Sequence, residues 1–271
     1  MSDKPDLIQS HYADGILSIS INRPDKKNAL TSDMYAQLAD LFDHRATQED
    51  VNVVVFSGGK DFSAGNDLED FLARPPSSEP GATAPVWEFM RALSTCPVPV
   101  IAAVDGFAVG IGTTLLLHCE FVYSTPKTVF MLPFINLAAV PEFGSSMLMP
   151  LRCGYVKAAE MLLLGDRFDS ATALQYNLIN QICSSDNLMP CAMATAAKLA
   201  GKSRQALVQS KALMRRDMEP LAERISIESE EFSSSSASKF LQITSEYCLV
   251  LSTVVSLTIS IFADFVSTTN I

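Results

Sequence analysis

The chain has 271 residues, enough for one large domain or for a domain with a helical appendage. Its 48% hydrophobic and 18% charged residues are typical of a folded globular protein and exclude a largely disordered one. Because 30 acidic residues outnumber 20 basic ones, the formal charge of -10 repels polyphosphate backbones and argues against non-specific nucleic-acid binding.

Cysteine usage and the chain ends bear on the compartment. The six cysteines form no CxxC pair and lie mostly among apolar neighbours, which indicates buried free thiols and a reducing environment. The first residues carry no basic region followed by an apolar stretch, and residues 268–271 do not form a peroxisomal or reticular retrieval signal. We therefore expect a cytoplasmic protein, with the peroxisome and the mitochondrion left open.

Strand and helix patterns alternate from the beginning of the chain. Residues 16–21 alternate apolar and small polar side chains, which predicts a strand, and residues 22–25 (NRPD) end it. Thr31 is a suitable cap for a helix whose apolar residues recur at helical spacing. Residues 51–56 are an almost continuous apolar run, which predicts a buried strand.

The same alternation continues after a polar interruption. Residues 72–85 are rich in Pro, Ser and Gly, which predicts a mobile surface loop of the kind that often borders a binding site. A helix is expected over residues 87–93, a buried strand over residues 97–104, and a glycine-bearing turn over residues 106–112. Beyond Tyr155 the pattern becomes mainly helical.

Two glycine-bearing turns are the first candidates for chemistry. Residues 62–68 (FSAGNDL) and 105–112 (DGFAVGIG) each follow a buried strand and precede a helical pattern. That geometry presents free backbone amides at helix N-termini. Either turn alone is best explained as ordinary turn chemistry, but the ordered pair is more specific.

The pair of turns, together with residues 22–24 (NRP), 28–30 (NAL) and 164–168 (LGDRF), resembles the enoyl-CoA hydratase/isomerase (crotonase) superfamily over roughly residues 7–231. The resemblance implies an α/β fold, a crotonase-like spiral of ββα units with a helical C-terminal region. Residues 1–200 would form the spiral core, and residues 201–271 an oligomerisation region with an atypical apolar tail. It also implies an acyl-CoA thioester substrate, no cofactor beyond the coenzyme A of the substrate, and homotrimers or hexamers.

The resemblance assigns roles to both turns. The backbone amides of Asn66 and Ile111 would bind the thioester oxygen, where enolate charge develops, and such donors are worth roughly 3 to 4 kcal/mol each. Lys26, Lys27 and the backbone near Ala29 would meet the nucleotide, although lysines in surface turns are often simply solvated. Asp67 is also among the implied CoA-binding residues, although it is expected to brace its turn rather than to touch the substrate. The remaining substrate or CoA contacts implied are Ser63, Ala64, Gly65, Leu68, Gly110 and Phe134.

Two positions argue against hydratase chemistry. Where hydratases of the superfamily carry their two glutamates, this chain has Thr114 and Phe134. Neither side chain can act as a carboxylate base, and adding water across a double bond needs an acid/base pair. We therefore expect the fold without ordinary hydratase activity.

Glu142 is the remaining candidate base. The segments 62–68, 133–137 and 141–146 are similar to those of monofunctional Δ3,Δ2-enoyl-CoA isomerases of fatty-acid beta-oxidation, in which this glutamate moves a proton from C2 to C4. Enclosure by Val140, Phe143 and Phe134 would raise its pKa by desolvation. A simpler alternative is that Glu142 caps a helix beginning near Gly144.

Other functions remain open at this stage. One is another crotonase-type activity, such as a hydratase with an unusual base or a thioester hydrolase, and another is a catalytically silent acyl-CoA-binding protein. His11, His44 and His118 have no partners at metal-ligand spacing, so no metal site is expected.

The C-terminal tail departs from the family pattern after about residue 232. Residues 247–263 are uncharged and dense in β-branched and apolar types, but polar residues interrupt them. A membrane span needs about 20 mostly apolar residues, so an anchor is marginal. An oligomer interface and a tail altered by splicing or a frame change are the competing interpretations.

Overall fold

The computed structural model describes residues 6–74, 84–216 and 219–232. The chain divides into two compact units, Met1–Lys211 and Ala212–Ile271. The second unit contains a helix over residues 221–232. The apolar tail from residue 233 onward, and residues 75–83 of the expected loop, lie outside the described residues.

The first unit is built on a six-stranded sheet in the order β1-β2-β3-β4-β6-β9. Only β1 is antiparallel to its neighbour, β2, and the other strands run parallel to one another. The strands are β1 (Ile8–Ala13), β2 (Ile16–Ile21), β3 (Val53–Ser57), β4 (Val100–Val104), β6 (Phe121–Ser124) and β9 (Gln181–Ile182). Parallel strands buried on both faces explain why residues 51–56 and 97–104 have apolar runs without alternation.

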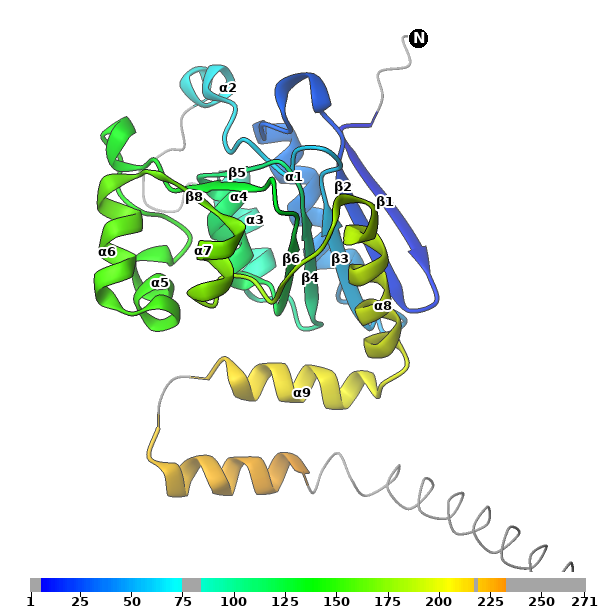
Figure 1. Ribbon diagram of the computed structural model, residues 1–271. Helices are drawn as coiled ribbons and strands as arrows, with labels where there is room; N and C mark the ends of the chain where they lie inside the picture. Colours follow the sequence, from blue (N-terminus) through cyan, green and yellow to red (C-terminus); the bar gives the residue numbers. More distant parts are fainter. Residues whose placement is uncertain (1–5, 75–83, 217–218, 233–271) are drawn as a thin grey trace, which may run out of the picture. The chain divides into compact units, whose positions relative to one another are not determined.

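Helices cover both faces of this sheet (Figure 1). Successive side chains of β3 and β4 point to opposite faces, so alternate residues enter two separate apolar clusters. The larger cluster includes residues of α1 (Ser32–Asp40) and α3 (Pro85–Ser94), and the smaller one includes residues of α8 (Leu188–Ala200). This layering is that of an α/β fold and confirms the fold class.

A second, three-stranded sheet stands beside the first. Its order is β5-β7-β8, with β5 (Phe107–Val109) parallel to β7 (Val129–Met131) and β8 (Arg167–Asp169) antiparallel to it. The other helices are α2 (Leu68–Ala73), α4 (Ile111–Thr114), α5 (Ser145–Cys153), α6 (Tyr155–Leu164), α7 (Ser170–Gln175) and α9 (Arg204–Met214), with short helical turns at Pro24–Lys26, Leu41–Arg45, Leu115–His118, Ile135–Leu137 and Ser185–Asn187.

Most expected elements are present. The predicted strand over residues 16–21 is β2, the helix after Thr31 is α1, and the strands expected around residues 51–56 and 97–104 are β3 and β4. Thr31 caps α1 by accepting a hydrogen bond from the backbone N–H of Met34 at 3.4 Å. The expectation of a loop from residue 72 was wrong at its start, because Leu72 and Ala73 complete α2.

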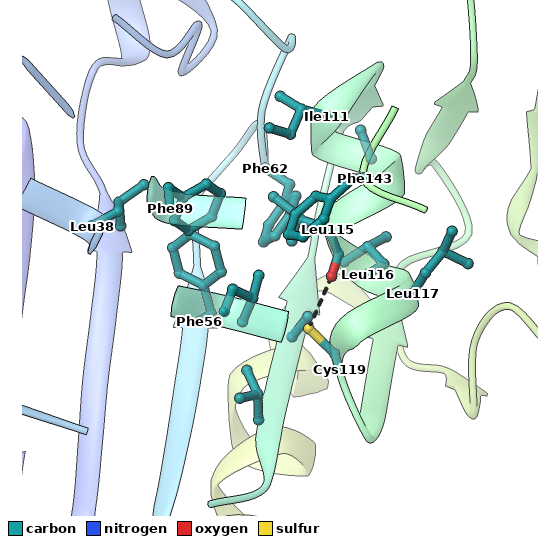
Figure 2. Packing of buried hydrophobic residues seen from close by; sticks show 14 of the residues in the cluster. Leu38, Phe56, Phe62, Phe89, Ile111, Leu115, Leu116, Leu117, Cys119 and Phe143 are labelled. Atoms are coloured by element: carbon teal, nitrogen blue, oxygen red, sulfur yellow. Dashed lines mark hydrogen bonds between the residues drawn. The ribbon is translucent and has the colours of Figure 1, made fainter. Parts of the chain in front are cut away.

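The larger cluster contains several aromatic rings, and Figure 2 shows Phe56, Phe62, Phe89 and Phe143 within it. The rings of Phe56 and Phe62 are 5.6 Å apart between centroids, and those of Phe89 and Phe143 are 6.1 Å apart. Phe62 begins the first glycine-bearing turn, and Phe143 follows Glu142. The core therefore extends from the central sheet to both segments in which chemistry was expected.

Candidate active site

The two glycine-bearing turns lie against each other. Ser63 donates its backbone N–H to the carbonyl of Phe107 at 2.8 Å, and its own carbonyl accepts the N–H of Val109 at 3.0 Å. These bonds form a parallel bridge between Ser63 and Ala108. Two segments that lie more than 40 residues apart in the sequence are thus hydrogen-bonded to each other through their backbones.

Glycine is required for this close approach. A Cβ atom on Gly65 would lie 2.7 Å from the carbonyl oxygen of Val109, and Gly65 has a φ of 91°. A Cβ atom on Gly112 would lie 2.6 Å from the carbonyl oxygen of Ser63. Both separations are shorter than a non-bonded contact allows, so a side chain at either position would separate the turns.

Two backbone amides of these turns, those of Asn66 and Ile111, were expected to bind a ligand oxygen. The bond from Leu30 N–H to Gly65 O, at 2.8 Å, uses the carbonyl of the peptide group that contains the Asn66 N–H, and the bond from Asp67 N–H to Leu30 O, also 2.8 Å, uses the next peptide group. Ile111 is the first residue of α4, where an N–H has no acceptor within the helix. In the described part of the chain, neither N–H donates to a protein acceptor. The assignment of Asn66 and Ile111 as the oxyanion donors remains a prediction.

Glu142 is a largely buried carboxylate that is only half satisfied. Its Oε1 accepts a hydrogen bond from the hydroxyl of Thr114 at 2.5 Å, whereas its buried Oε2 has no partner among the described residues. Burial raises the pKa of Glu142 from 4.5 to about 7, and the hydrogen bond from Thr114 opposes that rise. An unpaired oxygen on a carboxyl group with a pKa near neutrality suits a group that accepts and returns a proton.

The alternative role of Glu142 as a helix cap is wrong. The N-cap of α5 is Gly144, and no side chain caps that helix. Instead, the backbone carbonyl of Glu142 accepts the N–H of Ser145 at 3.0 Å and its hydroxyl at 2.6 Å. The Glu142 side chain is therefore free of the helix terminus and directed to Thr114.

Thr114 has a role that sequence reasoning missed. It was singled out because it cannot be a base, and it is fully buried as the donor to Glu142. It lies in the same short helix as Ile111, three residues further on, so the two side chains lie on one side of α4. This helix therefore connects one predicted oxyanion donor to the candidate base. A buried polar residue beside a carboxylate is a pattern that the sequence alone does not reveal.

Of the three residues expected to enclose Glu142, two are buried and one is exposed. Phe134 and Phe143 are buried, but Val140 is 78% exposed, so it does not enclose the carboxylate. Phe143 has a φ of 54°, which is unusual for a bulky residue. Its ring stacks on His118 at 4.0 Å between centroids, and its carbonyl accepts a hydrogen bond from Nε2 of His118 at 2.9 Å. His118 thus holds the segment that carries Glu142.

Tyr35 is a second residue that sequence reasoning missed. It lies in α1, is buried, and donates its hydroxyl proton to the side-chain oxygen of Asn66. The pKa of Tyr35 is raised well above its ordinary value of 10.0, first by burial and then by the negative charges of Glu142 and Asp70. Tyrosine within a helical apolar pattern gives no sequence signal of this position.

Comparison with known proteins bears on what these turns are. The protein-family model described as Enoyl-CoA hydratase/isomerase matches residues 11–246, which is most of the chain. The chain belongs to the enoyl-CoA hydratase/isomerase family. A solved structure from Magnetospirillum magneticum AMB-1, provisionally described as an enoyl-CoA hydratase/carnithine racemase, is 45% identical with a TM-score of 0.84 and covers 88% of this chain and 94% of that one.

Curated relatives in the enoyl-CoA hydratase/isomerase family carry different names. Enoyl-CoA delta isomerase 2 of Rattus norvegicus is 37% identical over 172 residues, 62% of this chain and 44% of the relative. The 1,2-epoxyphenylacetyl-CoA isomerase of Escherichia coli (strain K12) is 30% identical over 200 residues, 72% of this chain and 76% of the relative. The chain thus spans less than half of the first of these. The names do not agree on one reaction, so the side chains of the site must decide it.

The loop that contains Lys26, Lys27 and Ala29, which are expected to bind CoA, is held in shape by hydrogen bonds of Arg23 and Asn28. Asn28 is buried, accepts the N–H of Arg23 at 2.7 Å and donates to the carbonyls of Gly58 and Asp61 at 2.5 Å each. Arg23 also donates to the carbonyl of Ala29 at 2.8 Å. These contacts explain the NRP and NAL segments as architecture that shapes the loop.

Asp67 braces its turn, as expected. It caps α2 by accepting the N–H of Asp70 at 3.0 Å and pairs with Arg23 at 2.6 Å. These two contacts, in that order of importance, hold the pKa of Asp67 below its ordinary range. Asp67 is therefore a structural residue of the first turn.

The two lysines lie at the outer side of this loop. Both are exposed, and the ammonium group of Lys27 lies 4.3 Å from the centroid of the Phe107 ring. The backbone carbonyl of Lys27 accepts the N–H of Ala64 at 2.9 Å, so the lysine loop is joined to the first turn. Leu68 is exposed at the start of α2, and Gly110 precedes α4 with a φ of 56°. The contacts of Lys26, Lys27, Leu68 and Gly110 with CoA remain predictions.

Metal-ligand clusters and membrane-spanning helices are both absent from the residues that the structure describes. These residues contain no group of three or more His, Cys, Asp or Glu side chains arranged to hold a metal ion. Among them there is also no helix with the length and apolar character that crossing a membrane requires.

Proposed function

We propose that this chain is a Δ3,Δ2-enoyl-CoA isomerase of fatty-acid beta-oxidation, which converts a 3-enoyl-CoA to the 2-trans-enoyl-CoA. The observation that carries this proposal is the buried Glu142 with one unpaired oxygen, in a site whose other two candidate carboxylate positions are Thr114 and Phe134. A 1,3-proton shift needs one group that accepts a proton and returns it, whereas hydration needs groups that also hold and activate water.

The proposed reaction uses the elements of the site in sequence. Oε2 of Glu142 takes a proton from C2 of the thioester, and the electron pair of the broken C–H bond delocalises onto the thioester oxygen. The N–H groups of Asn66 and Ile111 stabilise the charge on that oxygen. The dienolate then collapses to the conjugated thioester as Glu142 returns the proton to C4. The base and the two amides account for both proton and charge, so we propose no cofactor beyond the coenzyme A of the substrate.

The pKa of Glu142 supports this role. Burial brings it to about 7, so that near neutral pH the group is partly ionised before the first step and is a competent acid in the second. The isomerase name of one relative agrees with the proposal, although this chain spans only 44% of that protein.

The test is conversion of 3-hexenoyl-CoA by the purified chain. Conjugation of the double bond with the thioester increases ultraviolet absorbance, and chromatography identifies the product. We expect 2-trans-hexenoyl-CoA from the wild type and from Glu160→Gln, which alters an exposed glutamate on α6. Glu142→Gln should lose roughly a thousandfold or more in kcat, because an amide cannot accept the proton. A 3-hydroxyacyl product or free CoA in place of the 2-enoyl thioester would replace isomerisation by hydration or hydrolysis.

We also propose that the chain forms homotrimers or hexamers, as its family typically oligomerises. Large apolar side chains on α5 and α6 are exposed in the single chain, namely Leu151, Tyr155, Val156 and Leu163. Such exposure is more than isolated surface residues usually show and favours self-association. Light scattering coupled to gel filtration measures the mass, and a monomer at micromolar concentration would contradict this part of the proposal.

A further inference from the structure

Tyr35 reaches the candidate site from an element that carries none of the expected motifs. It lies in the interior of α1, and only 4% of the residue is exposed. Its ring is tilted against Phe89 with centroids 5.7 Å apart, which is ordinary core packing. Its hydroxyl, however, leaves the apolar cluster and donates to the side-chain oxygen of Asn66. The ring and the hydroxyl therefore have different surroundings, and the hydroxyl needs an explanation of its own.

The hydroxyl completes the attachment of Asn66 to the rest of the unit. On the backbone side, Leu30 bonds to the carbonyl of Gly65 and to the N–H of Asp67, both at 2.8 Å. On the side-chain side, Tyr35 holds the carboxamide. Asn66 is thus attached on both sides, while its own N–H is left for a ligand. A donor held in this way keeps its direction when charge develops on the acceptor, which is the basis of preorganised stabilisation.

The N-terminal part of α1 is itself attached near the same turn. The backbone N–H and the hydroxyl of Ser32 donate to Oδ2 of Asp70 at 2.8 and 2.7 Å. Asp70 lies in α2, which begins two residues after Asn66. Helix α1 is thus bonded to α2 at Ser32 and to the first turn at Tyr35, at both ends of the chain segment 66–70.

The tyrosine hydroxyl is a constant donor. Burial, followed by the charges of Glu142 and Asp70, raises the pKa of Tyr35 well above its ordinary value of 10.0. The phenol therefore keeps its proton throughout the pH range in which Glu142 changes its ionisation. Its hydrogen bond to Asn66 is independent of the state of the base.

We propose that Tyr35 is a positioning residue for the thioester carbonyl: through the side chain of Asn66 it keeps the Asn66 N–H directed at the thioester oxygen. This inference rests on the proposed function, because it assumes that a thioester carbonyl binds at these amides. It differs from a packing role, for which the ring alone would suffice. Replacing Tyr35 by Phe keeps the ring and removes only the hydroxyl.

The test compares two ligands that do not react. Hexanoyl-CoA carries the thioester carbonyl, and S-hexyl-CoA has a methylene group in its place, so the ratio of their dissociation constants measures the contribution of the carbonyl site. Isothermal titration calorimetry gives both constants. We expect Tyr35→Phe to lower the preference for the thioester by roughly three- to tenfold, the effect of one weakened hydrogen bond, while the affinity for the thioether stays the same.

The matched control is Tyr123→Phe. Tyr123 is also buried, and its hydroxyl bonds to Thr195 at 2.7 Å, within the cluster on the other face of the sheet. Its loss removes one buried tyrosine hydroxyl without touching the turns, so it should leave the preference unchanged. An equal loss of preference in both variants would overturn the proposal, because the effect would then be general loosening of the fold.

A second variant keeps the proposal testable if Tyr35→Phe does not fold. Asn66→Ala keeps the backbone N–H and removes the group that Tyr35 holds, so it should lower the thioester preference by a similar factor. The double variant should lose no more than the larger of the two single losses, because both changes break one connection. Additive losses, or full preference in Asn66→Ala or Tyr35→Phe, would overturn the proposal.

The binding ratio also separates this inference from the proposed reaction. A wild type that prefers the thioester but does not isomerise 3-hexenoyl-CoA would contradict the proposed function and leave the positioning role to be decided by Tyr35→Phe. A wild type without any thioester preference would overturn the positioning role itself, since there would be no carbonyl site to hold.

Discussion

Thr114 donates its hydroxyl proton to Oε1 of Glu142 at 2.5 Å, and this bond divides the carboxylate into one held oxygen and one unpaired oxygen. The held oxygen fixes the direction of the group, and in the proposed reaction the unpaired Oε2 receives the substrate proton. In that proposal, the position at which a hydratase carries a glutamate serves to orient the single base. An ionised glutamate at position 114 has no proton to donate, so it could not make this hydrogen bond to Glu142.

The first prediction concerns this bond. The hydrogen bond from Thr114 lowers the pKa of Glu142, so Thr114→Val should raise that pKa above about 7. The base must be ionised to act, and the acid limb of the kcat/KM profile should therefore move to higher pH. Thr114→Ser keeps the hydroxyl and should keep the wild-type limb. Profiles between pH 5 and 9 decide the matter, and identical limbs in all three proteins would show that the bond does not tune the base.

The second prediction concerns stability. Burial raises the pKa of Glu142 from 4.5 to about 7, so in this interval the folded chain binds more protons than the unfolded one. The contribution of Glu142 to stability therefore falls as pH rises from about 4.5 to about 7, by about 3 kcal/mol. Glu142→Gln has no such titration, so its stability relative to wild type should improve between pH 5 and pH 8.

Urea unfolding at pH 5 and pH 8 measures this difference. The quantity to compare is the change in relative stability between the two pH values, because any fixed cost of placing an amide in the site cancels. Glu160→Gln alters an exposed glutamate that pairs with Lys157 and should remain parallel to wild type. A constant offset between Glu142→Gln and wild type would contradict the raised pKa.

Several strands and helices of the fold could be predicted from the sequence. β3 and β4 were predicted because strands buried on both faces need long apolar runs, and α1 because a capping threonine precedes helical spacing. β1 was missed because its residues after Ile8 are largely exposed and lack a clear alternation. β5 was missed because its three residues lie within the second glycine-bearing turn.

The sequence predicted Glu142 and the two backbone amides of the site, but not the side chains that hold them in place. Glycine turns before helices indicate free amides, so Asn66 and Ile111 could be named from spacing and family resemblance. Thr114, His118 and Tyr35 act through contacts with residues 28, 25 and 31 positions away along the chain. A side chain whose role depends on such a contact gives no local pattern, and these three residues needed the structure.

A third prediction concerns His118, which holds the segment that carries the base. Its Nε2 donates to the carbonyl of Phe143, and its ring stacks on the Phe143 ring. His118→Phe keeps an aromatic ring and loses the donor, whereas His118→Gln keeps a donor at a similar position and loses the stacking. An unpaired buried carbonyl costs about 1 to 3 kcal/mol, so His118→Phe should destabilise the Glu142 segment more.

Kinetics separates these two variants. We expect His118→Phe to lower kcat by roughly tenfold with little change in KM, because the base is displaced while the CoA contacts remain. His118→Gln should retain most of kcat. The opposite order would assign the main role to the stacked rings, and equal values would mean that His118 does not position Glu142.

A fourth prediction concerns the contact between the two turns. Gly65→Ala places a Cβ atom 2.7 Å from the carbonyl oxygen of Val109, and the turns must then move apart. Gly59→Ala is a matched control, because Gly59 also has a positive φ but its added Cβ meets no atom within 4 Å. Both variants bear the backbone strain of alanine at positive φ, on the order of 1 kcal/mol. Only Gly65→Ala should lose the preference for hexanoyl-CoA over S-hexyl-CoA, and equal behaviour of the two would show that the close approach is not required.

The last prediction concerns Lys26 and Lys27, the two lysines of the loop expected to bind CoA. Both lysines are exposed, but the ammonium group of Lys27 lies over the ring of Phe107, and the backbone carbonyl of Lys27 accepts the N–H of Ala64. If both ammonium groups meet the nucleotide phosphates, Lys26→Ala and Lys27→Ala should each raise KM a few fold without changing kcat, and the effect should shrink as salt screens the charges. Lys198→Ala, on α8 at the other face of the sheet, provides the control. Because the backbone of Lys27 and not its side chain bonds to Ala64, a fall in kcat for Lys27→Ala would mean that the cation over Phe107 holds the second turn in place.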